Sequence, residues 1–206
     1  MIKFLMKTFQ NEPSENNFEN WEVFNHDIYL NGSESKKKEI RHATCLARYN
    51  IEKDKKYSWM ENYFLSNLNS ELLKDKFLLD IGCFTGGRLS AWYENYELKK
   101  VYGIDINPIF KIAADEFILE KKIDAEFKTG VGEELPYNND FFDFVVSTDT
   151  FEHVQNLEKS MDECFRVLKP GGMLLAVFPQ FLQPFESHLN LVTKLPFLHW
   201  FFNSKK

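Results

Sequence analysis

The chain has 206 residues, of which 44% are apolar and 27% charged, with a formal net charge of -6. This length predicts one domain with a small accessory segment, and no stretch reaches the ~20 apolar residues that would span a bilayer. The acidic balance argues against a protein whose main partner is nucleic acid. Three cysteines without metal-ligand spacing indicate reduced thiols in the cytoplasm and no metal site.

Residues 1–75 are rich in Asn, Glu and Lys and show no convincing strand pattern, so we expect a helical cap. A turn is expected at Asn31-Gly32-Ser33, and the best helical pattern places Trp59 and its apolar neighbours near one face. The helices predicted for this segment cover residues 18–29, 35–49 and 55–73.

Beyond residue 76, short apolar runs alternate with amphipathic stretches, which is typical of parallel strands joined by crossover helices. Lys169-Pro170-Gly171-Gly172 should end the last helix, because the residue before a proline leaves the helical region and glycine permits the reversal. Strands are expected near residues 77–81, 101–104, 125–128, 142–147 and 173–178, and helices near 87–96, 108–121 and 157–168. Residues 76–180 are therefore predicted to form a doubly wound, mostly parallel α/β domain of the Rossmann-like class.

The first strand leads into a glycine-rich turn through an acidic residue, in the run Leu79-Asp80-Ile81-Gly82-Cys83-Phe84-Thr85-Gly86. Glycines let the backbone turn sharply and approach a ligand before the next helix begins. A carboxylate at Asp80 would repel the pyrophosphate of a dinucleotide, but it suits a ligand with a cationic amine. S-adenosylmethionine has such an amine and also a sulfonium.

Asp105 ends the second predicted strand, in Gly103-Ile104-Asp105-Ile106. An acid at this point of a βαβ unit lies beside the glycine turn, where it can accept hydrogen bonds from a ribose diol. The next residues, Asn107-Pro108, have the pattern of a helix cap followed by a first-turn proline.

An ordered series of motifs resembles the class I S-adenosylmethionine-dependent methyltransferases, particularly the small-molecule, type 11-like branch. It begins with the turn after the first strand and the acid Asp105. The later matching segments are Gly130–Tyr137 on the adenine side, Phe141–Ser147 in the fourth strand, and Phe151–Val154 and Leu168–Gly172 around the following helix. The resemblance covers about residues 76–179, and the ordered set is far more specific than any one motif.

The resemblance implies a role for individual residues. Asp80 would hold the methionine amino group, and Gly82 and Gly86 would admit the methionine portion. Asp105 would bind the ribose hydroxyls and Ile106 would pack on adenine. The implied cofactor site consists of Asp80, Gly82, Cys83, Phe84, Gly86, Asp105, Ile106, Gly132 and Glu133.

The chain departs from the family pattern at two positions. Phe84 replaces the usual middle glycine of the first motif, so the ligand must accommodate an aromatic side chain. Val131 stands where the family commonly has an aspartate for the adenine amino group, which leaves backbone groups, Glu133 or packing to select adenine. Glu133 as a solvated loop acid is the alternative.

His153 is the candidate general base, because it follows the fourth strand at the ligand-binding edge and histidine titrates near neutral pH. A base is needed only for a hydroxyl or a protonated amine acceptor. The alternative is that Glu152 and His153 orient the next helix. His188, after the fifth strand, is a second histidine for which a packing role is the simpler interpretation.

We expect methyl transfer from S-adenosylmethionine to a small organic acceptor, with lipophilic compounds among the candidates. The alternatives are a catalytically silent, methyltransferase-like binding or scaffold protein and, less favoured, an NAD(P)-dependent oxidoreductase. Residues 181–206 form an aromatic tail where the family usually adds two more strands, so those strands are expected to be missing. The tail is expected to cover the fifth strand, to act as a lid or to form a homodimer through this edge.

Overall fold

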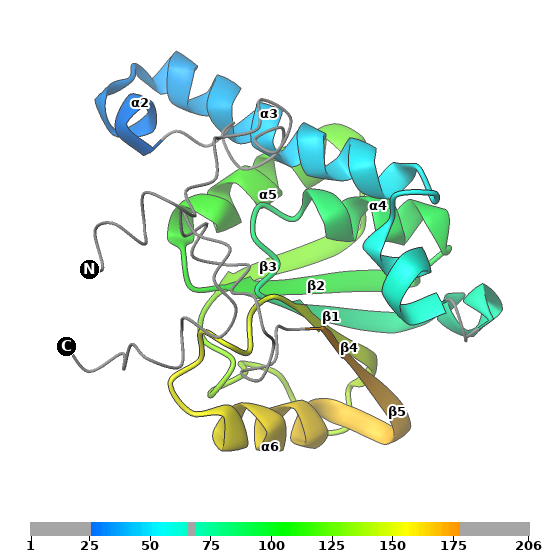
Figure 1. Cartoon of the computed structure of the whole chain (residues 1–206). Helices are drawn as coiled ribbons and strands as arrows, with labels where there is room; N and C mark the ends of the chain where they lie inside the picture. Colours follow the sequence, from blue (N-terminus) through cyan, green and yellow to red (C-terminus); the bar gives the residue numbers. More distant parts are fainter. Residues whose placement is uncertain (1–25, 66–68, 178–206) are drawn as a thin grey trace, which may run out of the picture. The chain divides into compact units, whose positions relative to one another are not determined.

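The computed structural model describes residues 26–65 and 69–177, all of them within one compact unit of the chain. Its centre is a sheet of five parallel strands in the order β3-β2-β1-β4-β5 (Figure 1). The strands are β1 (Phe77–Ile81), β2 (Lys100–Asp105), β3 (Ala125–Thr129), β4 (Phe142–Thr148) and β5 (Leu168–Val177). The predicted doubly wound α/β fold is confirmed.

Helices cover both faces of this sheet (Figure 1). α3 (Glu34–Lys53), α4 (Gly87–Asn95) and α5 (Pro108–Lys121) form one layer, and α6 (Leu157–Val167) packs on the other face. Because side chains alternate along a strand, Leu78 faces the core on the α4 side and Leu79 faces the core on the α6 side.

The crossover helices begin and end close to the predicted positions. The side chain of Asn107 caps α5 by accepting a hydrogen bond of 3.0 Å from the Ile109 amide, and Pro108 occupies the first turn as expected.

β5 begins earlier than predicted, because Leu168 already pairs with Phe142. The next paired residue on β5 is Met173, so the Lys169–Gly172 segment forms a bulge inside the strand.

The N-terminal part contains α2 (His26–Asn31) and α3, separated by Gly32 and Ser33, which matches the predicted turn. Ser33 caps α3 by accepting a hydrogen bond from the Lys36 amide. The single helix predicted for residues 55–73 is wrong. The chain instead forms a π-helical turn, η1 (Met60–Phe64), and a 3-10 turn, η3 (Ser70–Leu73).

The N-terminal helices are closely tied to the sheet domain. α3 packs on α4 and α5, and the Arg41 guanidinium donates to both carboxylate oxygens of Glu116 at 2.8 and 2.7 Å.

The proposed boundary near residue 76 stays a prediction. Residues 18–25 and 178–206 lie outside the described residues, and with them the predictions about His188, the aromatic tail, the missing strands and the dimer edge. Among the described helices, none combines the length and apolar character needed to cross a bilayer.

Candidate active site

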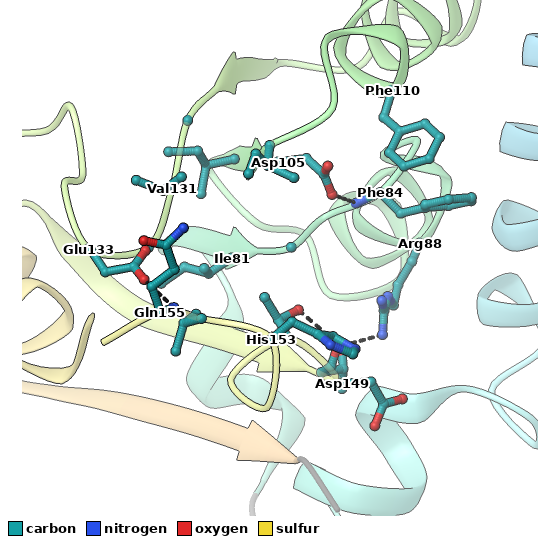
Figure 2. A pocket seen from close by; sticks show the side chains of 18 of the residues that line it. Ile81, Phe84, Arg88, Asp105, Phe110, Val131, Glu133, Asp149, His153 and Gln155 are labelled. Atoms are coloured by element: carbon teal, nitrogen blue, oxygen red, sulfur yellow. Dashed lines mark hydrogen bonds between the residues drawn. The ribbon is translucent and has the colours of Figure 1, made fainter. Parts of the chain in front are cut away.

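A cavity of about 890 Å³ opens at the carboxyl ends of β1, β2 and β4 (Figure 2). This is the edge where open parallel sheets bind ligands, and the volume lies within the usual range of about 300–1,000 Å³ for small-molecule sites. Seven of the predicted site residues line it: Gly82, Phe84, Asp105, Ile106, Gly132, Glu133 and His153. The described residues contain no group of three or more His, Cys, Asp or Glu side chains that could hold a metal ion.

The other three predicted residues, Asp80, Cys83 and Gly86, lie behind the cavity wall. The Cys83 side chain is buried in the core on the α4 side. Gly86 begins α4 with a φ of +74°, and a Cβ atom there would lie 2.6 Å from the Phe127 ring. Gly86 is therefore required for the close approach of α4 to β3, and the structure gives it no direct exposure to the cavity.

Gly82 forms the part of the turn that faces the cavity. Its φ is +76°, and a Cβ atom would lie 2.0 Å from the Thr150 hydroxyl oxygen. The amides of Gly82 and Cys83 both donate to the Ile104 carbonyl, at 2.8 and 3.1 Å. The turn after β1 is thus fixed against the ends of β2 and β4, and any larger residue at Gly82 would displace it.

Asp105 holds the same turn from the end of β2. Its Oδ2 accepts a hydrogen bond of 2.9 Å from the Phe84 amide (Figure 2). Its Oδ1 accepts one of 2.9 Å from the Asn107 amide. Burial raises the pKa of Asp105 above its ordinary value, and the two amides act in the opposite direction. Each carboxylate oxygen keeps further acceptor capacity toward the cavity.

Phe84 adopts a φ of +52°, a conformation that costs a residue with a side chain roughly 1–2 kcal/mol. Its ring packs on the Phe110 ring with centroids 4.2 Å apart, and both line the cavity. The backbone turn of the first motif therefore forms without the usual glycine, and the aromatic ring becomes part of the wall.

Asp80 is fully buried beneath the turn. Among the described residues, neither of its carboxylate oxygens has a hydrogen-bond partner. Its pKa is raised to about 7, chiefly by burial; attraction by Arg88 acts to lower the pKa, and repulsion from Asp105 and Glu52 adds to the rise. A buried carboxylate that lacks donors is costly, so this position favours a cation or a donor group nearby.

Ile106 and Val131 present apolar side chains to the cavity, with exposed fractions of 72% and 40%. Exposed aliphatic side chains at the end of β2 and in the loop after β3 suit a planar, weakly polar ring. Glu133 instead binds the loop after β4, because its Oε1 accepts hydrogen bonds from the Gln155 and Asn156 amides at 2.7 and 3.1 Å (Figure 2). Burial raises its pKa, but these backbone donors outweigh that effect and hold the pKa below its ordinary value.

His153 lies in a tight turn after β4, where its amide donates to the Thr150 carbonyl at 2.9 Å. Its side chain is 65% exposed and borders the cavity, with Nε2 3.8 Å from a Glu152 carboxylate oxygen. This placement gives the imidazole access to a bound molecule and to solvent, which a general base requires.

Sequence reasoning missed several residues that line the cavity. Arg88 comes from the first turn of α4 and donates to the Thr148 hydroxyl, Asp149 follows β4, and Arg48 comes from α3. Thr148 and Asp149 could have been found from their position at the carboxyl end of a strand. Arg48 could not, because only the packing of α3 on α4 brings it to this edge.

The chemistry of the cavity fits S-adenosylmethionine. A carboxylate at the end of β2 can accept from a diol, an aliphatic surface lies beside it, and a buried acid that lacks donors lies under the glycine turn. These are the partners needed by a ribose, a purine and an ammonium group, respectively.

Comparison with known proteins gives matches over the same region. The family described as "Methyltransferase domain" matches residues 79–176. The chain is 36% identical over 107 residues to the ubiquinone biosynthesis O-methyltransferase of Rattus norvegicus, which covers 47% of this chain and 29% of that protein. It is 34% identical over 106 residues to norajmaline N-methyltransferase of Rauvolfia serpentina, which covers 50% of this chain and 35% of that protein.

Among solved structures, the PH0226 protein from Pyrococcus horikoshii OT3 superposes with a TM-score of 0.50 and 29% identity, covering 58% of this chain and 54% of that one. The matched segments cover only 19% to 36% of the lengths of the curated relatives. The similarity thus coincides with the sheet and with the loops that line the cavity.

Proposed function

We propose that residues 79–176 form a class I S-adenosylmethionine-dependent methyltransferase domain and that the chain methylates a small organic acceptor, which the match to the methyltransferase-domain family supports. The observation that carries the proposal is the Asp105 carboxylate, held by the amides of Phe84 and Asn107 at the rim of the cavity beside Ile106. In this proposal residues 76–180 bind the cofactor in a cytoplasmic enzyme and residues 1–75 form its cap.

In this proposal each part of the cofactor binds to a different wall of the cavity. Asp105 accepts hydrogen bonds from the ribose hydroxyls, since each of its oxygens has acceptor capacity beyond one backbone amide. Ile106 and Val131 pack on the adenine ring. Asp80 attracts the amino group of the methionine portion through the Gly82 turn, because ionised Asp80 lacks hydrogen-bond donors among the described residues.

Little further chemistry is required of the protein. When bound, S-adenosylmethionine supplies an activated methyl group and a neutral leaving group. The protein's contribution is alignment of the acceptor, which can account for about 7–11 kcal/mol of barrier reduction. His153 accepts the proton of a hydroxyl or ammonium acceptor, since its exposed imidazole reaches the cavity.

The test is a calorimetric titration with S-adenosylmethionine and S-adenosylhomocysteine, with NAD as the competing nucleotide. We expect micromolar binding of both adenosyl compounds, no binding of NAD, and loss of binding in Asp105→Ala. Asp162→Ala is the matched control, because Asp162 lies on the exposed face of α6 and leaves the cavity unchanged. A folded protein that binds neither adenosyl compound would favour the silent binding or scaffold protein, and NAD binding would favour the oxidoreductase.

A further inference from the structure

The end of the cavity that contains Val131 would meet the edge of a purine ring. In the proposed function Ile106 and Val131 pack on the adenine, and an aliphatic surface alone rejects an analogue of similar shape only weakly. Strong discrimination needs hydrogen bonds to the ring edge, because a polar group that the wrong ligand leaves buried and unpaired is costly. The polar side chains at this end therefore determine which purines bind.

Glu133 is the carboxylate at this end, and it is bound to the protein. Its Oε1 accepts hydrogen bonds from the Gln155 and Asn156 amides at 2.7 and 3.1 Å (Figure 2). Both bonds end on one oxygen, so the loop after β4 sets the orientation of this carboxylate. Of the other acids that line the cavity within the described residues, Asp105 is assigned to the ribose, and Asp149 lies far from Glu133 in Figure 2.

Two further oxygen atoms in this region serve the local backbone. The Val131 carbonyl accepts a hydrogen bond of 3.3 Å from the Glu134 amide, which closes the turn after β3. The Asn156 side-chain oxygen accepts one of 3.0 Å from the Lys159 amide, which caps α6. The turn and the helix cap account for both oxygens without a ligand.

Gln155 differs from these groups because it is exposed and lines the cavity. A carboxamide both donates and accepts hydrogen bonds. The edge of adenine presents an amino donor beside a ring-nitrogen acceptor, and the edge of hypoxanthine presents an oxo acceptor beside a ring N–H donor. A half-turn of one carboxamide pairs it with either edge, and Lys159, which also lines the cavity, adds a group that only donates. These side chains therefore suit a 6-oxo purine as well as a 6-amino purine.

We propose that this end of the cavity binds a 6-oxo purine as readily as a 6-amino purine, with the Gln155 carboxamide turning to pair with either and Val131 supplying only packing. This inference rests on the proposed methyltransferase function and names the purine specificity of the same site. Val131 is 40% exposed in the loop after β3, so a carboxylate placed at this position would accept from an amino group and repel an oxo group. The side chain at position 131 therefore sets the selectivity.

The experiment is a calorimetric titration with S-adenosylhomocysteine and S-inosylhomocysteine, which differ at position 6 of the purine and in the proton on the adjacent ring nitrogen. Wild type is compared with Val131→Asp and with Val131→Asn, the matched control, because asparagine has the shape of aspartate but both donates and accepts. Gln155→Leu removes the carboxamide and keeps the backbone amide that donates to Glu133. The wild-type ratio of the two affinities tests the proposal without any substitution.

We expect wild type and Val131→Asn to bind the two compounds within about threefold of each other, and Val131→Asp to favour S-adenosylhomocysteine by about tenfold. Gln155→Leu should weaken both compounds by about three- to tenfold and leave their ratio unchanged.

A wild-type preference for S-adenosylhomocysteine of about tenfold or more would overturn the proposal, since Glu133 or the backbone would then select the amino group. An unchanged ratio in Val131→Asp, or unchanged affinities in Gln155→Leu, would also overturn it, because these side chains would then not face the purine edge. If wild type binds neither compound, the proposed function itself fails, which is a separate result.

Discussion

The Phe84 amide donates a hydrogen bond of 2.9 Å to the Asp105 carboxylate, and this bond joins the turn after β1 to the end of β2. The acid proposed to bind ribose thus also holds the residue that replaces the usual glycine of the turn. Cofactor binding and local structure are therefore coupled at Asp105. Substitutions of Asp105 must be compared with substitutions that change only the Phe84 side chain.

Asp105→Ala should weaken S-adenosylhomocysteine binding by about 10- to 100-fold, because it removes the acceptor of the ribose diol. It should also lower the free energy of unfolding by about 1–3 kcal/mol, since the amides of Phe84 and Asn107 lose their partner. Calorimetry and urea unfolding measure the two effects. Unchanged affinity in a destabilised variant would show that Asp105 is only structural.

Phe84→Gly should be more stable than Phe84→Ala by about 1 kcal/mol, because glycine adopts a φ of +52° without steric cost. Both variants lose the same ring contact with Phe110, so the difference isolates the backbone. The control pair is Phe110→Gly and Phe110→Ala within α5, where the order should reverse. Urea unfolding of the four variants is the measurement, and an alanine advantage at both positions would contradict the assignment of strain to Phe84.

The sequence was sufficient to predict the parallel sheet, because buried strands and amphipathic helices differ in hydrophobic period. Local signals such as the Asn107 cap were equally informative, since they depend on neighbouring residues alone. The predicted helix over residues 55–73 failed for the opposite reason. Glu52 accepts hydrogen bonds from the Ser58 side chain and the Trp59 amide, and these tie the chain to the end of α3.

The same distinction applies to the cavity. Asp105 and Gly82 follow strands directly, so their position at the sheet edge could be predicted from the chain. Arg48 lies on a helix that precedes the first strand, and its approach to Phe84 depends on how α3 packs. The burial of Asp80 likewise depends on the alternation of β1, which turns Asp80 away from the side that Ile81 exposes to the cavity.

Asp80→Asn should stabilise the protein without ligand at pH 8. The folded pKa of about 7 exceeds the ordinary 3.8, so the native state binds the proton more tightly than the unfolded chain. Wild-type stability should therefore fall as pH rises from about 4 through 7, by on the order of 4 kcal/mol at most, and the variant should lack this fall. Urea unfolding between pH 5 and about 8 measures the slope, and a slope shared with the variant would contradict the prediction.

The exposed Asp162→Asn provides the control for Asp80→Asn, since it should leave the wild-type slope unchanged. The proposed ammonium contact adds a second expectation. A cation near Asp80 favours its ionised form, so S-adenosylhomocysteine affinity should rise as pH passes through about 7 in wild type but not in Asp80→Asn.

Glu133→Gln should loosen the loop that carries His153 and Gln155. The substitution weakens two hydrogen bonds to backbone amides by removing the charge of their acceptor. Because the pKa of Glu133 is held below its ordinary value, its stabilising effect is present above pH ~4.5 and is lost as pH falls through the folded pKa. Hydrogen exchange of the Gln155 and Asn156 amides is the measurement. Glu134→Gln, an exposed neighbour, should leave it unchanged, and equal exchange in both variants would exclude this role.

Glu52→Gln should destabilise the wall of the cavity that contains Trp59. Glu52 is 2% exposed, and one of its oxygens accepts hydrogen bonds from Ser58 Oγ at 2.7 Å, the Trp59 amide at 3.0 Å and Trp92 Nε1 at 2.7 Å. A neutral amide can place an oxygen there but accepts more weakly, so we expect a loss of about 1–3 kcal/mol in the free energy of unfolding.

A change in the near-ultraviolet circular dichroism of the indoles should accompany that loss, because Glu52 fixes both Trp59 and Trp92. Glu71→Gln in the exposed 3-10 turn is the control and should alter neither signal. A destabilised Glu52→Gln protein with unchanged indole dichroism would show that this carboxylate stabilises the fold without positioning the two indoles.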